Sequence, residues 1–337
     1  MHAEFVVPAL LPRGDDQPYS AMPALELLLA RGRSVSNERR SYEQWIGAAC
    51  GLGEDDPLPA GALTLLAEGG APGDAVWMRA DPVHLRLGRT DLRVVPAVTF
   101  ALDAHEADAL AGELNRHYGK ELRLQPVQPK HWCVRIAAAP RLSTRPTAEV
   151  AGGDVDANLP QGEDAKRWHA LMNEIQMLLH RDPVNEARQA RGAPEVNSVW
   201  FWGAGKLPEP AAALPWRSIT ADDPLARGLG LHAGRSVQLL PDSAGTWLAR
   251  QPTEGRHLVV LDMLRMPFAM GDTSGWVAAL ESLEARWFAP LLDALRAGRI
   301  GMFTLHAPDG REALAVETVR SDLRRFWRRA KPLSAYC

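Results

Sequence analysis

Short apolar runs bounded by turn residues recur along the chain and predict buried β-strands. Three of them are 5–11, 258–261 and 300–305. The run 258–261, which is apolar throughout, is typical of a strand covered on both faces of a sheet. Between the last two runs, residues 276–295 have the length and apolar spacing of a long helix, which Pro290 interrupts. The order strand, helix, strand predicts a βαβ unit and therefore an α/β fold.

The region from about 75 to 137 has a different pattern, with apolar and polar residues alternating, and predicts a β-rich unit. Its strands are predicted at 76–80, 83–87, 92–100 and 131–136. One helix is predicted to begin at Asp103, which is followed three residues later by Glu106, the spacing of a capping box. The apolar face of this helix includes Leu110 and Leu114, and Gly119 ends it.

The clearest amphipathic pattern predicts a helix over 162–180 with an apolar stripe along one side. The opposite side carries His169, Asn173, Gln176 and His180, which share a face that is polar but nearly uncharged. This face either lies at the surface or in internal hydrogen bonds, or it turns towards a cleft and binds a ligand. The two histidines are about three helical turns apart, too far along the axis to hold one metal ion together.

The composition is that of a folded globular protein, with 46% hydrophobic and 23% charged residues among 337. A formal net charge of −3 gives no overall basic excess, so nucleic-acid binding is not favoured. The 3 cysteines are far apart and form no Cys-x-x-Cys pair, which predicts reduced thiols and a cytoplasmic location. No apolar run approaches the roughly 20 residues of a membrane span, and residues 1–12 lack the features of a signal peptide.

The C-terminal region departs from this balanced charge. Its basic residues are Arg320, Arg324, Arg325, Arg328, Arg329 and Lys331. Their spacing predicts a final helix over 321–329, with Phe326 and Trp327 among the charges. The basic face is either solvated, as cations near a helix C-terminus commonly are, or an anion-binding patch. The 11 tryptophans also allow exposed aromatic anchors for a protein partner, although most tryptophans lie in cores.

One candidate anion site is Gly203-Ala204-Gly205-Lys206, which follows a predicted strand at 197–202. A glycine turn at the end of a strand either presents backbone N–H groups to an anion, here with Lys206 beside them, or simply reverses the chain. A Walker A phosphate loop is excluded, because Trp200 and Leu207 stand where that motif needs glycine and a hydroxyl residue.

A second candidate is the segment Arg79-Ala80-Asp81-Pro82-Val83-His84, which places three functional side chains within one short stretch. Arginine suits bidentate recognition of phosphate or carboxylate. The alternative is a surface strand with an Asp-Pro turn. The polar residues Asn185 to Arg188, which follow the helix over 162–180, by themselves indicate a helix end with solvated charges.

Three segments together resemble one family. Pro23-Ala24-Leu25-Glu26-Leu27-Leu28-Leu29-Ala30-Arg31-Gly32 is similar to an early P-N-L-D-x-L-A-x-x-G helix, and residues 77–115 are similar to an inserted, substrate-covering domain. The most specific segment, Asn197-Ser198-Val199-Trp200-Phe201-Trp202-Gly203-Ala204-Gly205-Lys206, resembles N-x-I-W-x-W-G-Q-G-K. On these residues the chain resembles the archaeal-type cofactor-independent phosphoglycerate mutases of the alkaline-phosphatase superfamily. It resembles still more closely a bacterial branch known as pathogenicity-factor regulatory proteins.

The resemblance implies a three-layer α/β/α core of alkaline-phosphatase type, made of residues 1–72 and 195–337. An α+β unit, residues 73–194, is then inserted into that core. The resemblance also implies a site with two divalent metals and a phosphorylated serine. Two such ions need several Asp and His ligands to hold them and to clamp the phosphoryl oxygens.

The chain departs from the family at those ligand positions. The family's first strand ends in Asp-Gly, where this chain has Val7 to Leu11. The family's D-E-A-G-H-x-x-D segment corresponds to Met266 to Asp272, which is mostly apolar, and its D-H-S-T-P becomes Leu305 to Pro308. Of these ligands only His306 remains, without its Asp partner.

These departures favour a catalytically inactive protein that binds a small phosphorylated or acidic ligand, or a protein partner, and serves regulation. The alternatives are a phosphoglycerate mutase or phosphatase with altered ligands, which would use Mn or Mg, and a protein-binding module. The nearest candidate nucleophiles, Ser36 and Ser41, have no supporting motif. Outside the enzyme alternative we predict no metal or other cofactor, and no membrane association. The candidate ligand-binding residues are Arg79, Asp81, His84, His169, Asn173, His180, Arg188, Asn197, Trp202, Lys206 and His306.

Overall fold

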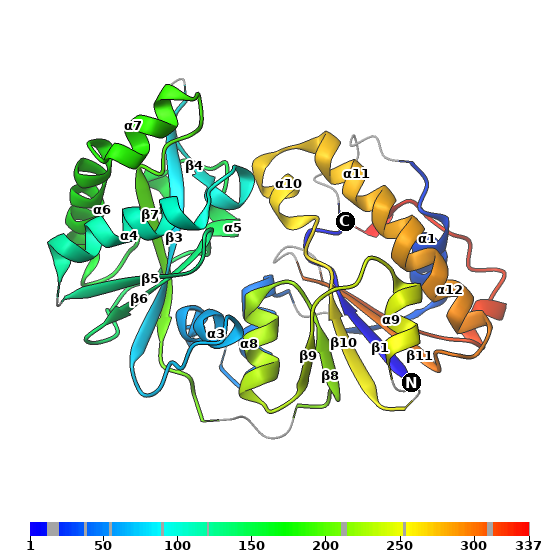
Figure 1. Ribbon diagram of the computed structural model, residues 1–337. Coiled ribbons are helices and arrows are strands. Elements are labelled where there is room, and N and C mark those ends of the chain that lie inside the picture. The colour runs from blue at the N-terminus through cyan, green and yellow to red at the C-terminus, as the bar shows by residue number, and fades with distance from the viewer. Residues whose placement is uncertain are drawn as a thin grey trace. The chain divides into compact units, whose positions relative to one another are not determined.

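The structure is a computed structural model that describes residues 1–11, 20–36, 39–53, 56–88, 91–119, 121–209, 214–251, 254–308 and 313–336. The chain divides into two compact units (Figure 1). Unit 1 combines Met1–Gly51 with Pro210–Cys337, and unit 2 is Leu52–Glu209. Unit 2 is therefore inserted into the sequence of unit 1.

Unit 1 is built on a sheet whose described strands have the order β2-β12-β11-β1-β10-β8-β9. They are β1 (His2–Val6), β2 (Arg33–Ser36), β8 (Ser218–Thr220), β9 (Ser236–Gln238), β10 (Arg256–Val260), β11 (Met302–Pro308) and β12 (Ala313–Val319). β1, β8, β9, β10 and β11 run parallel, whereas β12 pairs antiparallel with β11 and with β2. The predicted βαβ unit is present, and β1 lies between its two strands, β10 and β11.

Helices cover both faces of this sheet and make three layers (Figure 1). They are α1 (Pro23–Arg31), α2 (Tyr42–Ala49), α8 (Pro224–His232), α9 (Ala244–Arg250), α10 (Arg265–Met270), α11 (Thr273–Leu283) and α12 (Ala289–Arg296). Successive residues of β8 show the two faces: Thr220 accepts a hydrogen bond from Trp247 of α9, while Ile219 packs close to Gly230 of α8. Phe5 of β1 lies in the apolar core on the α9 face, which α1, α11 and α12 also line. Unit 1 is thus an α/β/α sandwich, as predicted.

The first strand ends earlier than the predicted 5–11. β1 covers His2–Val6 and stops before Pro8, whose nitrogen has no hydrogen to donate to the ladder. Beyond the strand, Ala9 has a φ of 60°, a left-handed conformation that glycine usually adopts. The carbonyl of Ala9 accepts a hydrogen bond from Trp276 Nε1 at 2.9 Å, so a tertiary contact holds this turn.

The helix predicted over 276–295 is two helices joined by a π-helical turn. α11 ends at Leu283, the π-helical turn covers Glu284–Phe288, and α12 begins at Ala289, directly before Pro290. Proline cannot donate a backbone hydrogen bond, and its ring clashes with the carbonyl four residues earlier. The wider π turn accommodates this break without ending the helical path.

Unit 2 contains a second sheet, and β3 is its longest strand. The described strands are β3 (Val76–Leu87), β4 (Leu92–Pro96), β5 (Leu122–Gln128), β6 (His131–Ile136) and β7 (Ser198–Gly205). β3 pairs antiparallel with β4, β6 and β7. The two strands predicted at 76–80 and 83–87 form one strand, because Asp81 and Pro82 continue the pairing with β7 and make no turn. The strand predicted at 92–100 ends at Pro96, after which the chain makes a 3₁₀ turn.

The helices described in unit 2 are α3 (Ala60–Ala67), α4 (Ala104–Tyr118), α5 (Thr147–Val150), α6 (Ala165–His180) and α7 (Pro183–Ala190). The predicted capping box of α4 is confirmed. The Asp103 side chain accepts from the Glu106 backbone N–H, and the Glu106 side chain accepts from the Asp103 backbone N–H. α6 lies within the predicted 162–180, and its Trp168 packs edge-on against Phe201 of β7.

The boundaries of unit 2 differ from the predicted 73–194, since residues 52–72 and 195–209 belong to it. The first segment contains α3, which packs so closely on β3 that a Cβ at Gly61 would lie 2.4 Å from the backbone nitrogen of Met78. The second segment contains β7, which pairs with β3. Both segments flank the insertion in sequence, and only the pairing in space assigns them to unit 2.

We expect Gly61→Ala to destabilise the protein by about 2–3 kcal/mol, because backbone atoms of Met78 leave no room for a methyl group. Helix propensity alone predicts the opposite sign, a gain of roughly 1 kcal/mol. Gly112→Ala is the matched control, since nothing lies closer than 4.0 Å to a Cβ at that position in α4. Urea denaturation measures both variants. A stabilised Gly61→Ala protein would contradict the close approach of α3 to β3.

The helix predicted over 321–329 is not formed. The 3₁₀ turn Asp322–Arg324 is the regular element in this stretch, and a second 3₁₀ turn, Leu333–Tyr336, follows it. Arg325 and Arg328 donate hydrogen bonds to the carbonyls of Arg31 and Gly32 at the end of α1, and these tertiary contacts replace helix formation. Among the helices of the described ranges, none is long and apolar enough to cross a membrane. Cys337 lies outside the described residues.

Candidate functional site

An acidic cluster lies at the carboxyl edge of the parallel strands of unit 1. Asp222 and Asp223 follow the end of β8 after one intervening residue, and Asp262 likewise follows the end of β10. β8 and β10 are neighbouring parallel strands, so their carboxyl ends meet at one edge of the sheet. In open α/β sheets this edge is where ligands bind. The cluster is therefore the first candidate for a functional site.

The helices that follow or face these strands complete the cluster. Asp223 caps α8 by accepting a hydrogen bond from Ala226 N at 2.9 Å, and it accepts a second one from the Tyr42 hydroxyl at 2.6 Å. Arg265, the first residue of α10, donates to Glu43 Oε1 at 2.6 Å. The guanidinium of Arg265 also lies over the ring of Tyr42, 4.6 Å from the ring centroid.

The electrostatics of this cluster depend on one cation. Burial, and then the nearby charge of Asp223, raise the pKa of Asp262 to about 7, while the charge of Arg265 acts in the opposite direction. Burial and Asp223 also raise the pKa of Tyr42 well above its usual range. The second oxygen of Glu43 is buried and accepts no hydrogen bond from the described residues. Arg265 is thus the internal countercharge of a carboxylate cluster.

A pair of divalent metals does not fit the residues that the structure describes at this edge. In the part of the chain that the structure describes, no group of three or more His, Cys, Asp or Glu side chains is arranged to hold a metal ion. In the acidic cluster the guanidinium of Arg265 lies against the carboxylate of Glu43, and Oδ2 of Asp223 accepts hydrogen bonds from both Ala226 N of α8 and the Tyr42 hydroxyl.

His306 lies on β11 in the same unit and has a carboxylate partner that the sequence did not reveal. Its Nε2 is 2.8 Å from Glu4 Oε1 on β1, and its ring centroid is 5.8 Å from that of Trp45. Glu4 also accepts from Trp216 and Arg256, both at 2.5 Å. Burial alone would raise the pKa of Glu4, but these hydrogen bonds outweigh it and lower the pKa to about 2. Glu4 therefore stays ionised and fixes the His306 ring.

Arg79, Asp81 and Trp202, three of the predicted site residues, do come together in unit 2. Arg79 Nε donates to Asp81 Oδ1 at 2.8 Å, and Trp202 Nε1 donates to Asp81 Oδ2 at 2.7 Å. Thr64 and Thr147 complete the network with hydrogen bonds to Arg79 and Asp81 at 2.9 Å and 2.5 Å. All of these side chains are buried, so the network joins β3, β7, α3 and α5 and leaves little surface for a ligand.

Other candidates on β3 and β7 make backbone contacts. His84 Nδ1 lies 3.0 Å from the carbonyl of Glu195, and burial lowers the pKa of the ring. The Asn197 side chain pairs with the backbone of Leu85 at 2.7 Å and 3.0 Å, which extends the contact with β3 to the residue before β7 begins. Lys206 is exposed beyond β7. His84 and Asn197 therefore lie close together where the segment before β7 runs beside β3, whereas Lys206 lies beyond the opposite end of β7.

The polar face of α6 is mainly a solvated surface. His169 Nε2 lies 2.7 Å from the carbonyl of Pro160, while Asn173 and His180 are exposed. Met177, on the same helix, is also exposed. Of the two interpretations of this face, the surface one describes it.

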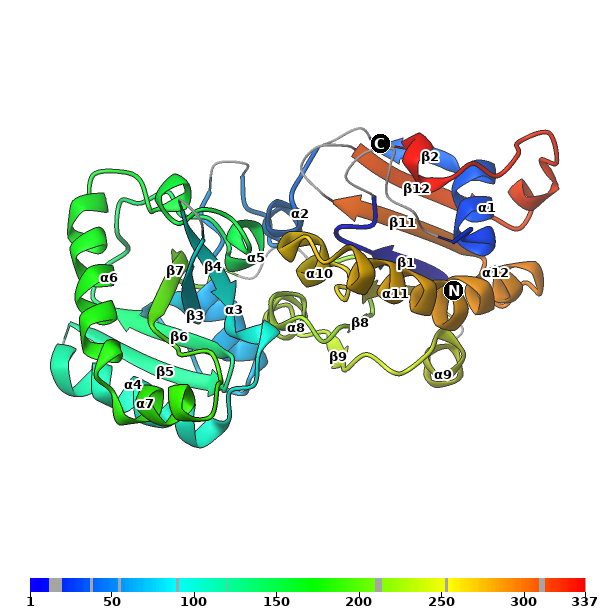
Figure 2. The ribbon, with the colours of Figure 1, turned by 90° about the horizontal axis from the view of Figure 1, so that it is seen from above.

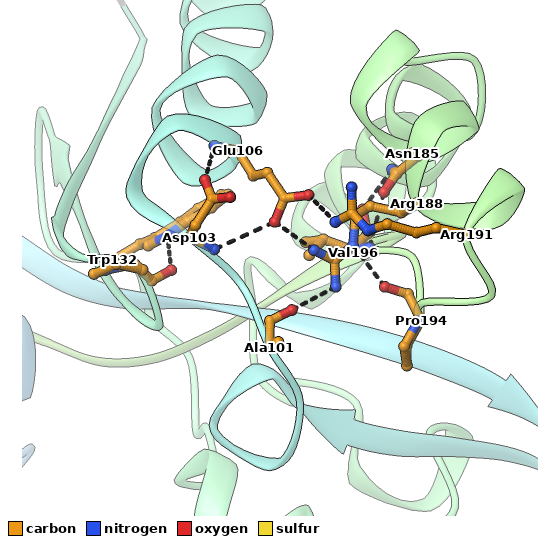
Figure 3. Close-up of polar contacts among 10 residues, drawn as sticks. Ala101, Asp103, Glu106, Trp132, Asn185, Arg188, Arg191, Pro194 and Val196 are labelled. Atoms are coloured by element: carbon orange, nitrogen blue, oxygen red, sulfur yellow. Dashed lines mark hydrogen bonds and ion pairs between the residues drawn. The ribbon is translucent and has the colours of Figure 1, made fainter.

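Arg188 is buried completely. The prediction that residues 185–188 form a helix end with solvated charges is therefore wrong for Arg188. Its guanidinium donates to Glu106 Oε2 at 2.6 Å and to the carbonyls of Ala101 and Pro194 at 2.7 Å each (Figure 3). Arg191 reaches the other oxygen of Glu106 from the more exposed side. Arg188 therefore fastens α7 to the beginning of α4, an internal role.

Of the two candidate serines, Ser41 has a role in capping a helix. Ser41 is the N-cap of α2: its hydroxyl accepts from Gln44 N, and the Gln44 side chain accepts from Ser41 N in return. The side chain of Ser36, at the end of β2, lies outside the described residues. Asp272, the acidic residue of the segment that corresponds to the metal-binding motif, caps α11.

Comparison with known proteins gives two findings on relationship. The chain is 35% identical over 190 residues to a probable 2,3-bisphosphoglycerate-independent phosphoglycerate mutase of Geobacter sulfurreducens. The match covers 51% of this chain and 47% of that protein, so the chain spans about half the length of this relative. No family model matches the chain.

Two solved structures overlap most of the chain, and the first is similar in fold. The PH0037 protein from Pyrococcus horikoshii overlaps 94% of this chain and 86% of its own, with a TM-score of 0.55 and 13% identity. A cofactor-independent phosphoglycerate mutase from Thermoplasma acidophilum overlaps 100% of this chain and 95% of its own at 16% identity. Its TM-score of 0.46 is too low to carry an argument about the fold.

The sequence match and the shared α/β fold agree with the three-layer architecture of unit 1. Over about half its length this chain is thus similar in sequence to a bisphosphoglycerate-independent phosphoglycerate mutase, and it shares its α/β fold with the PH0037 protein.

Proposed function

We propose that this phosphoglycerate-mutase-like chain is catalytically inactive and acts by binding, in a regulatory role. The observation that supports this most directly is the Arg265–Glu43 ion pair in the acidic cluster at the carboxyl edge of the unit 1 sheet. A fixed guanidinium neutralises carboxylates, but it has no exchangeable coordination positions. It cannot bind a water and lower its pKa, as a metal ion does.

A second candidate function, a mutase or phosphatase with altered ligands, draws support from the His306–Glu4 pair. A histidine oriented by a buried carboxylate is a general base or acid in many active sites. Trp45 and Trp216 contact this pair. Among the described residues, no serine or cysteine that could act as a nucleophile contacts it. The pair therefore supports the enzyme alternative less strongly than Arg265 supports the binding role.

The proposed inactivity predicts no interconversion of 3-phosphoglycerate and 2-phosphoglycerate by the purified full chain, with or without Mn²⁺ or Mg²⁺. It also predicts no change in thermal unfolding temperature on addition of either metal, because a ligand that does not bind the native state cannot stabilise it. An active phosphoglycerate mutase, assayed in parallel, is the control. Metal-dependent turnover that His306→Ala abolishes would overturn the proposal and favour the enzyme alternative.

Within the binding role, a protein partner has more support than a small phosphorylated ligand. The arginines proposed for ligand binding, Arg79 and Arg188, are engaged by Asp81 and Glu106. We further propose a cytoplasmic location, for which the free thiols of Cys50 and Cys133 are the support.

A further inference from the structure

The C-terminal segment of unit 1 exposes two aromatic rings among basic side chains. Phe326 is 78% exposed and Trp327 is 67% exposed. Their rings pack edge to face, with centroids 5.3 Å apart. We call this surface the Arg–Trp patch; it consists of Arg320, Arg324, Phe326, Trp327, Arg329 and Lys331. Two neighbouring large apolar rings in water are unfavourable for an isolated protein, so the patch is a candidate contact surface.

Other arginines in the segment hold the patch in place. Arg325 donates to the carbonyl of Arg31 at 3.2 Å, and Arg328 donates to the carbonyl of Gly32 at 2.5 Å. In return, the Arg31 guanidinium donates to the carbonyl of Leu323. These bonds satisfy carbonyls at the C-terminal end of α1, beside which the segment runs (Figure 2). The patch is therefore presented by a fixed backbone, which lowers the entropy that binding must overcome.

The positive charge of the patch is not neutralised locally. Nearby Asp322 pairs with Arg325 at 2.8 Å and lies 3.8 Å from Arg33. Within the described ranges, no ion pair joins Arg324, Arg329 or Lys331 to a carboxylate. The whole chain carries a net charge of −3, so this cationic surface is a local feature. Its complement is an anionic partner.

We propose that the Arg–Trp patch docks an acidic segment of a partner protein. This inference rests on the proposed binding role and names the class of partner. Aromatic residues and arginine are enriched at the centres of protein interfaces, where lysine is depleted, and the patch is rich in arginine. Guanidinium groups pair with carboxylates through two parallel hydrogen bonds. Since Phe326 and Trp327 pack against each other, they offer one joint apolar surface and no slot in which a nucleobase stacks.

The test uses the full chain and a fluorescein-labelled peptide in which glutamate pairs flank a central Leu-Phe. We expect binding in about the micromolar range and a loss of at least about tenfold in Trp327→Ala and in Arg324→Glu/Arg329→Glu. Arg250→Glu/Arg286→Glu is the matched control, because it makes the same change in net charge at two exposed positions of unit 1 outside the patch. All three proteins should unfold like the parent, since the altered side chains are exposed.

Three results would overturn the inference. The first is that the protein does not bind the peptide. The second is an equal loss of peptide affinity in both double variants, because it would indicate attraction by net charge alone. Tighter binding to polyuridylate RNA or to phosphatidylserine vesicles than to the peptide is the third, since either would assign a different partner. This test can fail independently of the proposed catalytic inactivity. Metal-dependent mutase turnover would overturn the proposed inactivity and leave peptide binding unaffected.

Discussion

Replacing Arg188 with methionine is expected to lower the free energy of unfolding by about 3–5 kcal/mol. The Arg188 side chain is completely buried, and its guanidinium bonds to Glu106 and to the carbonyls of Ala101 and Pro194. Methionine keeps much of the volume but leaves a buried carboxylate and two carbonyls without these donors. The lost free energy of unfolding therefore comes from buried polar groups without hydrogen-bond donors and not from a cavity. Urea denaturation of the full chain, followed by circular dichroism, measures it.

Arg191→Met is the matched control for Arg188→Met. Arg191 pairs with the same Glu106, but its side chain is 52% exposed, so water replaces most of the lost contact. We expect a loss below about 1 kcal/mol, as for surface ion pairs in general. Equal losses in the two variants would show that burial does not distinguish them and would contradict the internal role of Arg188.

Replacing Arg265 with methionine is expected to have a similar effect in unit 1, about 3–5 kcal/mol at pH 8. The substitution removes the partner of Glu43 and the countercharge of Asp223 and Asp262. The loss should become smaller at pH 5, because Asp262 with a pKa of about 7 is then protonated and needs no countercharge. Denaturation with urea at the two pH values measures the difference.

The raised pKa of Asp262 also predicts the direction in which the stability of the unsubstituted protein changes with pH. An aspartate in an unfolded chain has a pKa of about 3.9, so between roughly pH 4 and pH 7 the native Asp262 binds more proton than the unfolded one. Stability then falls as the pH rises through this window and levels off above it. Asp262→Asn should flatten this part of the profile. If Arg265→Met lost the same free energy at pH 5 and pH 8, the coupling between Arg265 and Asp262 would be disproved.

The Arg265 cluster also bears on how the chain relates to its mutase relatives. Carboxylates at the edge of a parallel sheet are suited to cations. Here the cation is a covalently attached guanidinium, held by Glu43 and by the ring of Tyr42. Under the proposed binding role, this guanidinium serves as the countercharge that a metal ion supplies in a metal centre.

The sequence by itself determined the parts of the molecule that depend on local patterns. The apolar runs located β10, β11 and the last residues of β1, and the capping box located the start of α4 at Asp103. These features depend on the spacing of neighbouring residues, which the sequence states directly. The α/β class followed from the order of such elements, and the three-layer arrangement of unit 1 from the family resemblance.

Only the tertiary structure decided which polar side chains meet. Glu4 and His306 are 302 positions apart and become partners because β1 and β11 are adjacent strands. Arg188 looked solvated in a polar segment, yet α4 covers it and supplies Glu106. The C-terminal arginines had helical spacing, but the end of α1 offered carbonyls that replaced the helix. Each case depends on contacts between elements distant in sequence, where burial changes the energy of a charge far more than local propensity does.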